Sequence, residues 1–203
     1  MPPKAKLKPP SNSPRPKSTL PKNWPPNLPY LTNPLYPRTL PASIITTLHT
    51  PPPTATIQTP TLGPSPNTRI TPVPPTSSHP AAGQNSLTTT RHLPPSSLIL
   101  YYLGTVHTTA DSDPTSRYDL CLDRELDLGI DAARMGNEAR FVNDYRGVAA
   151  GPNAEFRDVW VRVAGRVERW VGVYVLPAGK SGKRAAGIVK GEEILVSYGK
   201  GFW

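Results

Sequence analysis

The distribution of proline is the feature that most constrains this chain. Of its 28 prolines, 25 lie in residues 1–95 and only three follow. Proline fixes φ and lacks a backbone N–H, so it interrupts both helices and central strands. A single compact domain of all 203 residues is therefore excluded, and regular structure is expected mainly after residue 95.

Charge divides the chain at the same place. Residues 1–95 hold nine Lys/Arg and no Asp or Glu, whereas residues 96–203 hold fourteen residues of each sign. A segment so rich in Pro, Ser and Thr buries too little apolar surface to offset the entropy of ordering it. The sequence predicts a basic, mostly disordered leader over residues 1–77 and one domain over residues 78–203.

Two features of the leader suggest contacts. The stretch from Trp24 to Tyr36 is apolar enough to dock on the domain. Segments in which prolines alternate with cationic residues are typical ligands of proline-binding modules. Two hypotheses for the leader therefore stay open, a flexible segment without a partner and a ligand of such a module. Nucleic-acid binding is disfavoured, because aromatic and cationic residues do not cluster on one element.

Several other classes of protein are disfavoured. Cys121 is the single cysteine, so an intramolecular disulfide and a cysteine-based zinc cluster are excluded, and the four histidines are scattered, so we predict no metal site. No apolar run approaches the ~18 residues of a membrane helix. We expect a soluble protein of the nucleus or cytoplasm.

The second half has the pattern of a mainly β domain. Residues 98–103 form a continuous apolar run, and residues 118–123 alternate between apolar and polar. Residues 159–163 and 171–176 resemble an antiparallel pair joined by residues 165–169, and residues 194–198 resemble a further strand. The only helix expected is a short one within residues 132–139.

Three segments carry a resemblance to a known family. They are Tyr102 to Gly104; Arg140 to Arg146 followed by Pro152-Asn153-Ala154; and Gly191 to Gly199. In this order they resemble the motifs Tyr-x-Gly, Arg-Phe-Ile-Asn-His-Ser-Cys-x-Pro-Asn and Gly-Glu-Glu-Leu-x-x-x-Tyr-Gly. The chain is thus similar over about residues 80–203 to the SET-domain protein-lysine methyltransferases, and most to fungal members.

The resemblance implies a SET-like fold of short twisted sheets, in which the Asn143 segment passes under the loop of Tyr198 in a knot-like crossing. It implies a pocket for S-adenosylmethionine and an apolar channel for the target lysine of a histone or another basic protein. Tyr198 and Tyr102 would be the catalytic pair. Asn143 would hold the amino-acid end of the cofactor.

The other residues are assigned by the same resemblance. The residues expected at the cofactor are Gln84, Asn85, Ser86, Arg140, Phe141, Asn143, Asp144 and Trp203. The residues expected along the substrate channel are Tyr102, Phe141, Val196 and Phe202.

One departure from the family pattern motivates an alternative. Where the family has Gly-x-Gly, this chain has Gln84-Asn85-Ser86, with Gly83 one residue earlier. A serine forced into positive φ would cost on the order of 1 kcal/mol. A catalytically silent SET-like module that acts in protein–protein interaction is the competing hypothesis.

A run of acidic residues precedes the second motif. Two roles remain open for it, a solvated strand edge that discourages aggregation and a rim that attracts a basic peptide. Its members are Asp111, Asp113, Asp119, Asp123, Glu125, Asp127 and Asp131.

Overall fold

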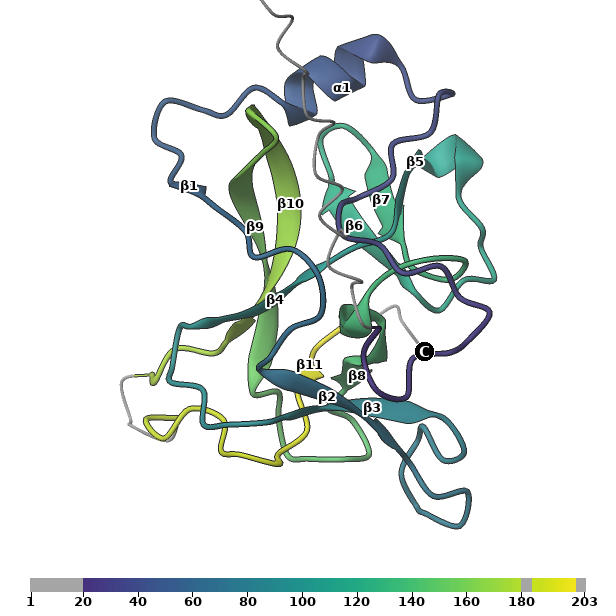
Figure 1. Cartoon of the computed structure of the whole chain (residues 1–203), viewed down its shortest axis with the longest axis vertical. Helices are drawn as coiled ribbons and strands as arrows, with labels where there is room; N and C mark the ends of the chain where they lie inside the picture. The colour runs from purple at the N-terminus through teal and green to yellow at the C-terminus, as the bar shows by residue number, and fades with distance from the viewer. Residues whose placement is uncertain (1–19, 180–183, 200–203) are drawn as a thin grey trace, which may run out of the picture.

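The computed structural model describes residues 20–179 and 184–199, and it confirms a mainly β chain (Figure 1). The largest sheet has the order β1-β9-β10-β4, with β1 Ile57–Gln58, β9 Ala154–Val163, β10 Arg166–Val175 and β4 Leu98–Tyr102. A second sheet has the order β5-β7-β6, with β5 Thr105–Thr108, β7 Leu128–Asp131 and β6 Asp119–Asp123.

Smaller elements complete the fold. Two strand pairs are β2 Thr68–Pro72 with β3 Asn85–Thr89, and β8 Asn143–Asp144 with β11 Leu195–Val196. In the described part of the chain, the α-helix α1 spans Ala42–Leu48, and the 3₁₀ turns are η1 Thr109–Asp111 and η2 Glu138–Phe141. Within the described ranges, no helix has the length and apolarity to cross a membrane.

The long hairpin of β9 and β10 is tighter than predicted. The two strands pair over their full length, from Arg166 opposite Val163 to Val175 opposite Ala154. The turn is made by Ala164 and Gly165 alone, with φ values of 48° and 82°. Two consecutive residues with positive φ match the right-handed twist of the strands. Of the connection expected at 165–169, only Gly165 belongs to the turn, and residues 166–169 are the start of β10.

Other predicted elements differ in length or type. The strands expected at 98–103 and 118–123 are confirmed as β4 and β6, but only Leu195–Val196 of the run 194–198 forms a strand. The helix expected within 132–139 is wrong, since the 3₁₀ turn η2 begins only at Glu138. Gly136 instead exchanges backbone hydrogen bonds with the segment around Tyr30, through Pro29 O and Leu31 N.

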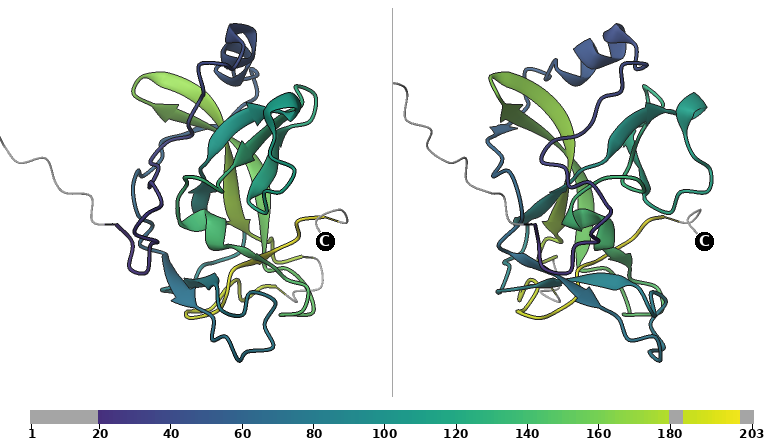
Figure 2. Two further views of the ribbon diagram at one scale, coloured as in Figure 1. Left: turned by 90° about the vertical axis from the view of Figure 1, so that its right-hand side faces the viewer. Right: turned by 45° about the vertical axis from the view of Figure 1, so that its right-hand side comes forward.

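The structure differs from the expectation of a mostly disordered leader over residues 1–77. Residues 20–77 pack on the domain, and Trp24, Leu40, Leu48 and Ile70 lie in its main hydrophobic core. Figure 2 shows the purple and blue part of the chain running along the sheets. An extended, proline-rich segment needs no hydrophobic core of its own when its apolar side chains are buried in the core of the domain. The predicted docking of the Trp24–Tyr36 stretch is confirmed. Residues 1–19 lie outside the described residues.

An ionic clasp joins the two larger sheets. Arg169 of β10 bonds to Asp123 of β6 and to Asp158 of β9, the latter at 2.6 Å. Asp123 is buried, and its other carboxylate oxygen accepts the backbone N–H groups of Glu125 and Leu126. The clasp therefore positions the end of β6 against the central hairpin.

Replacing Arg169 with glutamine should destabilise the protein strongly. The change leaves the buried Asp123 carboxylate without its cation, so we expect the free energy of unfolding to fall by about 2 to 4 kcal/mol. Urea denaturation measures the loss. The control is Arg157→Gln, which breaks the pair with Glu155, both partners being about one-third exposed, and should cost about 1 kcal/mol or less. Equal losses in the two variants would contradict the clasp.

A second polar contact fixes the other end of β6. His107 of β5 and Asp119 of β6 meet at 2.9 Å across Gly129 of β7. A Cβ at Gly129 would lie 2.5 Å from the His107 ring and 2.8 Å from the Asp119 carboxylate. The absence of a side chain at residue 129 is what lets the two strands be bridged.

Gly129→Ala should therefore cost about 1 to 3 kcal/mol in the free energy of unfolding, because the methyl group displaces the His107–Asp119 contact. Gly151→Ala is the matched control, since a Cβ there would meet nothing within 4 Å. Thermal or urea unfolding should separate the two variants. If both behave like the wild type, the bridge does not constrain β6.

Candidate functional site

The C-terminal segment crosses the chain at β8, and this crossing builds the site. β11 pairs in parallel with β8, so Leu195 lies beside Asn143 and Val196 beside Asp144. On the other side of the segment, Asn153 N–H donates to Leu195 O at 3.0 Å and its side-chain oxygen accepts Leu195 N–H at 2.8 Å. Residues 143–153 thus hold the segment that leads to Tyr198 from two sides.

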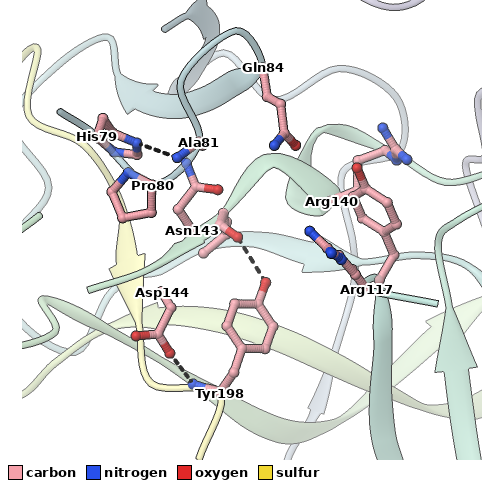
Figure 3. A pocket seen from close by; sticks show the side chains of 11 residues that line it. His79, Pro80, Ala81, Gln84, Arg117, Arg140, Asn143, Asp144 and Tyr198 are labelled. Carbon is pink, nitrogen blue, oxygen red and sulfur yellow. Dashed lines mark hydrogen bonds between the residues drawn. The ribbon is translucent and has the colours of Figure 1, made fainter. Parts of the chain in front are cut away.

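A pocket of about 370 Å³ opens beside this crossing (Figure 3). We call it the tyrosine pocket. Its lining comes from the loop between β2 and β3, from the start of β6, from η2 and β8, and from the C-terminal segment. The lining residues are His79, Pro80, Ala81, Gln84, Arg117, Tyr118, Arg140, Val142, Asn143, Asp144 and Tyr198.

The Tyr198 side chain points into the pocket with its hydroxyl held. The hydroxyl donates to Val142 O at 2.8 Å, and the Tyr198 N–H donates to Asp144 Oδ2 at 3.0 Å. Burial, the nearby Asp144 carboxylate and the Tyr118 side chain raise the pKa of Tyr198 well above its ordinary value. The hydroxyl is therefore neutral at physiological pH, and its hydrogen is donated to Val142 O.

Asp144 anchors the turn around Tyr198. Its carboxylate accepts the Arg146 side chain at 2.8 and 2.9 Å, the Arg146 N–H at 2.9 Å and the Tyr198 N–H. Burial alone would raise the pKa of Asp144, but these hydrogen bonds outweigh it and lower the pKa to about 2. Asp144 is therefore a charged, structural acceptor at the pocket wall.

Asn143 is oriented by Glu193. The Asn143 amide nitrogen donates to Glu193 Oε1 at 2.9 Å and to Asn85 O at 3.4 Å. Glu193 also pairs with His79 Nε2 at 3.1 Å, and His79 Nδ1 accepts the Ala81 N–H at 2.9 Å. Since both hydrogens of the Asn143 amide are directed at these acceptors, its Oδ1 is left as an acceptor for a donor in the pocket.

Two arginines give the pocket positive charge. The 3₁₀ turn η2 directs Phe141 into the core and Arg140 toward the pocket, where Arg140 Nε donates to Ala132 O at 3.0 Å. The Arg140 guanidinium lies 4.0 Å from the centre of the Tyr118 ring. Arg117 lines the same region (Figure 3). An anionic or electron-rich group is favoured at this end of the pocket.

The loop that was expected to be strained is not. Positive φ falls on Gly83, at 78°, and a Cβ there would meet nothing within 4 Å. Asn85 and Ser86 belong to β3, where Ser86 pairs with Thr71 and is buried. The cost expected for a serine in positive φ is therefore absent, and Gln84 reaches the pocket.

The structure sorts the predicted residues into two groups. Those that line the tyrosine pocket are Gln84, Arg140, Asn143, Asp144 and Tyr198. Those that lie behind it, in strands or in the core, are Asn85, Ser86, Tyr102, Phe141 and Val196. Phe202 and Trp203 lie outside the described residues.

Tyr102 differs most from its expected place. It is 1% exposed, and its hydroxyl donates to Tyr118 O at 2.6 Å. Burial and the neighbouring Tyr198 raise the pKa of Tyr102 well above its ordinary value. Tyr102 thus stands one layer behind the pocket wall and holds the start of β6.

Sequence reasoning missed several lining residues. Tyr118 begins the predicted alternating strand and Arg117 precedes it, so the sequence could place Tyr118 on a strand face but could place neither residue in a pocket. His79 gives no local signal, because its partner Glu193 is 114 residues away. Only the tertiary fold brings these groups to Asn143 and Tyr198.

A second pocket, of about 460 Å³, lies between β6 and the β9–β10 hairpin. We call it the β6–β9 pocket, and its lining includes Cys121, Leu122, Phe156 and Val171. The Phe156 ring packs on Tyr198, with ring centres 5.4 Å apart, and on Tyr102, at 5.9 Å. One aromatic side chain therefore lies next to both pockets.

The acidic run is partly engaged inside the protein. Asp119 pairs with His107, and Asp123 pairs with Arg169. Asp131 accepts the Ser116 hydroxyl at 2.7 Å and the Ala133 N–H at 2.8 Å. These three carboxylates have partners inside the protein. If the acidic run attracts a basic peptide, its other members would provide that attraction.

Comparison with known proteins gives structural neighbours only. No family model matches the chain, and no curated protein matches it. Among solved structures, an apo ctPRC2 with mutations in Ezh2 matches 65% of this chain with 19% identity and a TM-score of 0.48. A ctPRC2 in an autoinhibited conformation bound to S-adenosylmethionine matches 68% with 18% identity and a TM-score of 0.49. In both cases the match spans 15% of the solved chain.

Asp144→Asn tests the electrostatic anchor. A carboxylate whose pKa is lowered in the folded state contributes stability above its unfolded pKa of about 4, and the contribution is lost as pH falls through about 2. The variant should be less stable than the wild type by about 1 to 2 kcal/mol at neutral pH, allowing for water around the partly exposed Arg146. The difference should shrink between pH 4 and pH 2.

Urea denaturation across this pH range measures the effect. The control is Asp127→Asn at an exposed turn, which should change the free energy of unfolding at neutral pH by no more than about 0.5 kcal/mol. A constant difference between Asp144→Asn and the wild type from pH 6 to pH 2 would contradict the assignment.

Proposed function

We propose that this chain is an S-adenosylmethionine-dependent protein-lysine N-methyltransferase of SET-like fold. The observation that carries the proposal is one shared pocket. Gln84, Arg140, Asn143, Asp144 and Tyr198, which come from three separate parts of the sequence, line it together. Four of them belong to two segments that resemble motifs of this enzyme family.

The pocket has the chemical character that the cofactor requires. Its volume of about 370 Å³ lies within the ~300 to 1,000 Å³ common for small-molecule sites. Asn143 Oδ1 would accept from the ammonium group, and Arg117 and Arg140 would pair with the carboxylate.

The bound cofactor would supply a sulfonium methyl group. A neutral lysine nitrogen would form the new C–N bond to this methyl carbon while the C–S bond breaks, and the electron pair of the C–S bond would stay on sulfur. The proton of the methylated amine would then pass to water. The Tyr198 hydroxyl oxygen would lie near this methyl group as a weak C–H···O acceptor. Its orientation is fixed by donation to Val142 O. A preoriented dipole of this kind favours the transition state without reorganisation.

The charge around the pocket also favours a neutral acceptor. Lysine has a reference pKa near ~10.4 and must lose a proton before it can attack. Arg117 and Arg140 line the donor side, and positive charge nearby disfavours a second cation. The β6–β9 pocket adds the apolar surface of Leu122, Phe156 and Val171, next to charged residues of both signs.

We infer that the acceptor lysine of a histone or other basic protein approaches through the β6–β9 pocket. Phe156 lines that pocket, and its ring packs on Tyr198. The pocket lining carries charged residues of both signs, which are Asp123, Arg124, Glu125, Arg157, Asp158 and Arg169. The proposal therefore places acceptor and donor on two sides of one aromatic residue.

The competing hypothesis of a silent interaction module rested on strain in the loop of residues 84–86. Positive φ is confined to Gly83 in this loop. The physical motive for weak cofactor binding is therefore removed, and the enzyme hypothesis is favoured.

Calorimetric titration with S-adenosylmethionine is the first test. We expect binding in the micromolar range, and no heat of binding at millimolar cofactor would refute the proposal. Asn143→Ala should weaken binding at least about tenfold, because it removes a charge-assisted acceptor worth about 1.5 to 3 kcal/mol. Purified histones and lysine peptides, analysed by mass spectrometry, serve as acceptors.

Tyr198→Phe should separate binding from transfer. We expect cofactor affinity within about threefold of the wild type and methyl transfer reduced about 100-fold, as when an oriented group at a reacting centre is removed. The matched control is Tyr36→Phe, which removes another half-buried hydroxyl, bonded to Glu168 at 3.3 Å. Retained transfer in Tyr198→Phe would remove this residue from the catalytic role.

A further inference from the structure

We propose that the end of the molecule formed by β2, β3 and the turn before β11 binds the phosphate backbone of double-stranded DNA. Four exposed cations lie there, Lys22, Arg69, Arg91 and Lys190, and we call this surface the basic end. In the sequence these cations lie on separate elements, which disfavours nucleic-acid binding, but the fold brings the four together. The inference goes beyond the proposed function and does not depend on it.

Lys22 and Arg69 lie on adjacent segments. Asn23 Nδ2 donates to Ile70 O at 2.8 Å, which places residue 22 beside β2. Arg69 directly precedes Ile70 in β2 and is exposed, whereas Ile70 is fully buried. Since side chains alternate across a strand, Arg69 points away from the core. Two exposed cations are therefore available on this side of the β2–β3 pair.

Arg91 and Lys190 join them from the other side of the pair. Thr89, the last residue of β3, accepts the Gly191 N–H at its backbone oxygen at 3.0 Å, so the turn with Lys190 lies beside the end of this strand. Arg91 follows β3, and its Nε donates to Asn67 Oδ1 at 2.7 Å. This hydrogen bond holds the Arg91 guanidinium next to the start of β2.

The charge of the basic end is not neutralised within the described part of the chain. Residues 20–95 and 184–191 contain no Asp or Glu. The next carboxylates along the chain are those of Glu192 and Glu193, and both accept hydrogen bonds inside the protein. Among the ion pairs that the described residues form, none involves the four cations. An external anion is therefore the partner that their charge favours.

The spacing of the four segments suits the phosphates of a duplex. Adjacent strands lie ~4.8 Å apart, so the three steps from residue 22 across β2 and β3 to Lys190 span about 15 Å. B-form DNA carries one phosphate per ~3.4 Å of helix axis on each strand, so a row of this length faces about four phosphates. Four cations and four phosphates can therefore be matched.

Two features favour a duplex over other polyanions. Residues 66–91 and 184–191 contain no Phe, Tyr or Trp, so these segments offer no aromatic ring on which the bases of a single strand could stack. A flexible acidic peptide loses conformational entropy when it is ordered, whereas a duplex presents its phosphates at a fixed spacing. Because phosphate contacts carry no sequence information, binding should not depend on the base sequence.

Fluorescence anisotropy tests the proposal with the full chain and a labelled DNA duplex of about 24 base pairs, in KCl from about 50 to 300 mM. Four phosphate contacts contribute about −3.6 to the slope of log K against log[KCl]. In Arg69→Gln/Arg91→Gln/Lys190→Gln, the slope should become shallower by about 2.7, and the affinity at about 150 mM salt should fall at least about 30-fold. Residues 1–19 carry five further Lys/Arg, so the difference between variants is the quantity to compare.

Arg38→Gln/Arg162→Gln/Arg166→Gln is the matched control, because it removes the same charge at the opposite end. Figure 1 shows α1 and the turn of the β9–β10 hairpin at the top, and β2 and β3 at the bottom. Arg162 and Arg166 flank that turn, Arg38 precedes α1, and all three are exposed. Charges more than ~10 Å apart are screened at these salt concentrations, so the slope should change by no more than about 0.5.

Several outcomes would overturn the proposal. They are the absence of DNA binding at the lowest salt concentration, equal losses in the two triple variants, and competition by poly-L-glutamate as effective per charge as that by unlabelled duplex. Urea denaturation checks that the variants fold. If the first triple variant does not, Arg69→Gln and Lys190→Gln alone should each make the slope shallower by about 0.9, and an unchanged slope in both would refute the basic end.

The result is separable from the proposed function. None of the four cations lines the tyrosine pocket, so S-adenosylmethionine affinity in the Arg69, Arg91 and Lys190 variant should stay within about threefold of the wild type. A chain that binds DNA through the basic end but binds no S-adenosylmethionine would refute the enzyme alone. A chain that binds the cofactor but shows no loss of DNA affinity in this variant would refute the basic end alone.

Discussion

The parallel pairing of β11 with β8 is the constraint on which the site depends. It places Leu195 and Val196 beside Asn143 and Asp144, and Asn153 closes the other side of the same segment. Asp144 then accepts the Tyr198 N–H, and Glu193 orients Asn143. Without this crossing, the residues that line the tyrosine pocket would have no common location, because they come from four separate parts of the chain, residues 79–84, 117–118, 140–144 and 198.

The rest of the structure supports the crossing by fixing what surrounds it. The Arg169 clasp and the His107–Asp119 bridge hold the two ends of β6, whose start supplies Tyr118 and Arg117 to the pocket. The N-terminal segment adds Trp24 against Phe141 and a hydrogen bond from Tyr30 to Glu138 at 2.7 Å. These contacts stabilise η2, the turn that directs Arg140 outward. A segment that sequence composition assigned to a leader is thus part of the scaffold.

The tyrosine pocket and the β6–β9 pocket differ in the side chains that line them. The tyrosine pocket combines hydrogen-bonding and charged groups with apolar ones, and the β6–β9 pocket combines the apolar Leu122, Phe156 and Val171 with charged residues of both signs. A polar, charged donor and an apolar-stemmed amine acceptor have matching requirements. The proposed reaction needs both environments within reach of one hydroxyl, and Tyr198 is where they meet.

The sequence by itself determined the mainly β class, the strands β4 and β6, and five of the residues that line the pocket. These follow from local alternation of side chains and from short ordered motifs. It did not determine the role of residues 20–77. Their low apolar content predicts that they form no hydrophobic core of their own, but it does not predict whether they pack against the core of the domain. Nor did it find His79, Tyr118 or Phe156, or the burial of Tyr102. Their positions depend on contacts between distant segments, which only the tertiary structure decides.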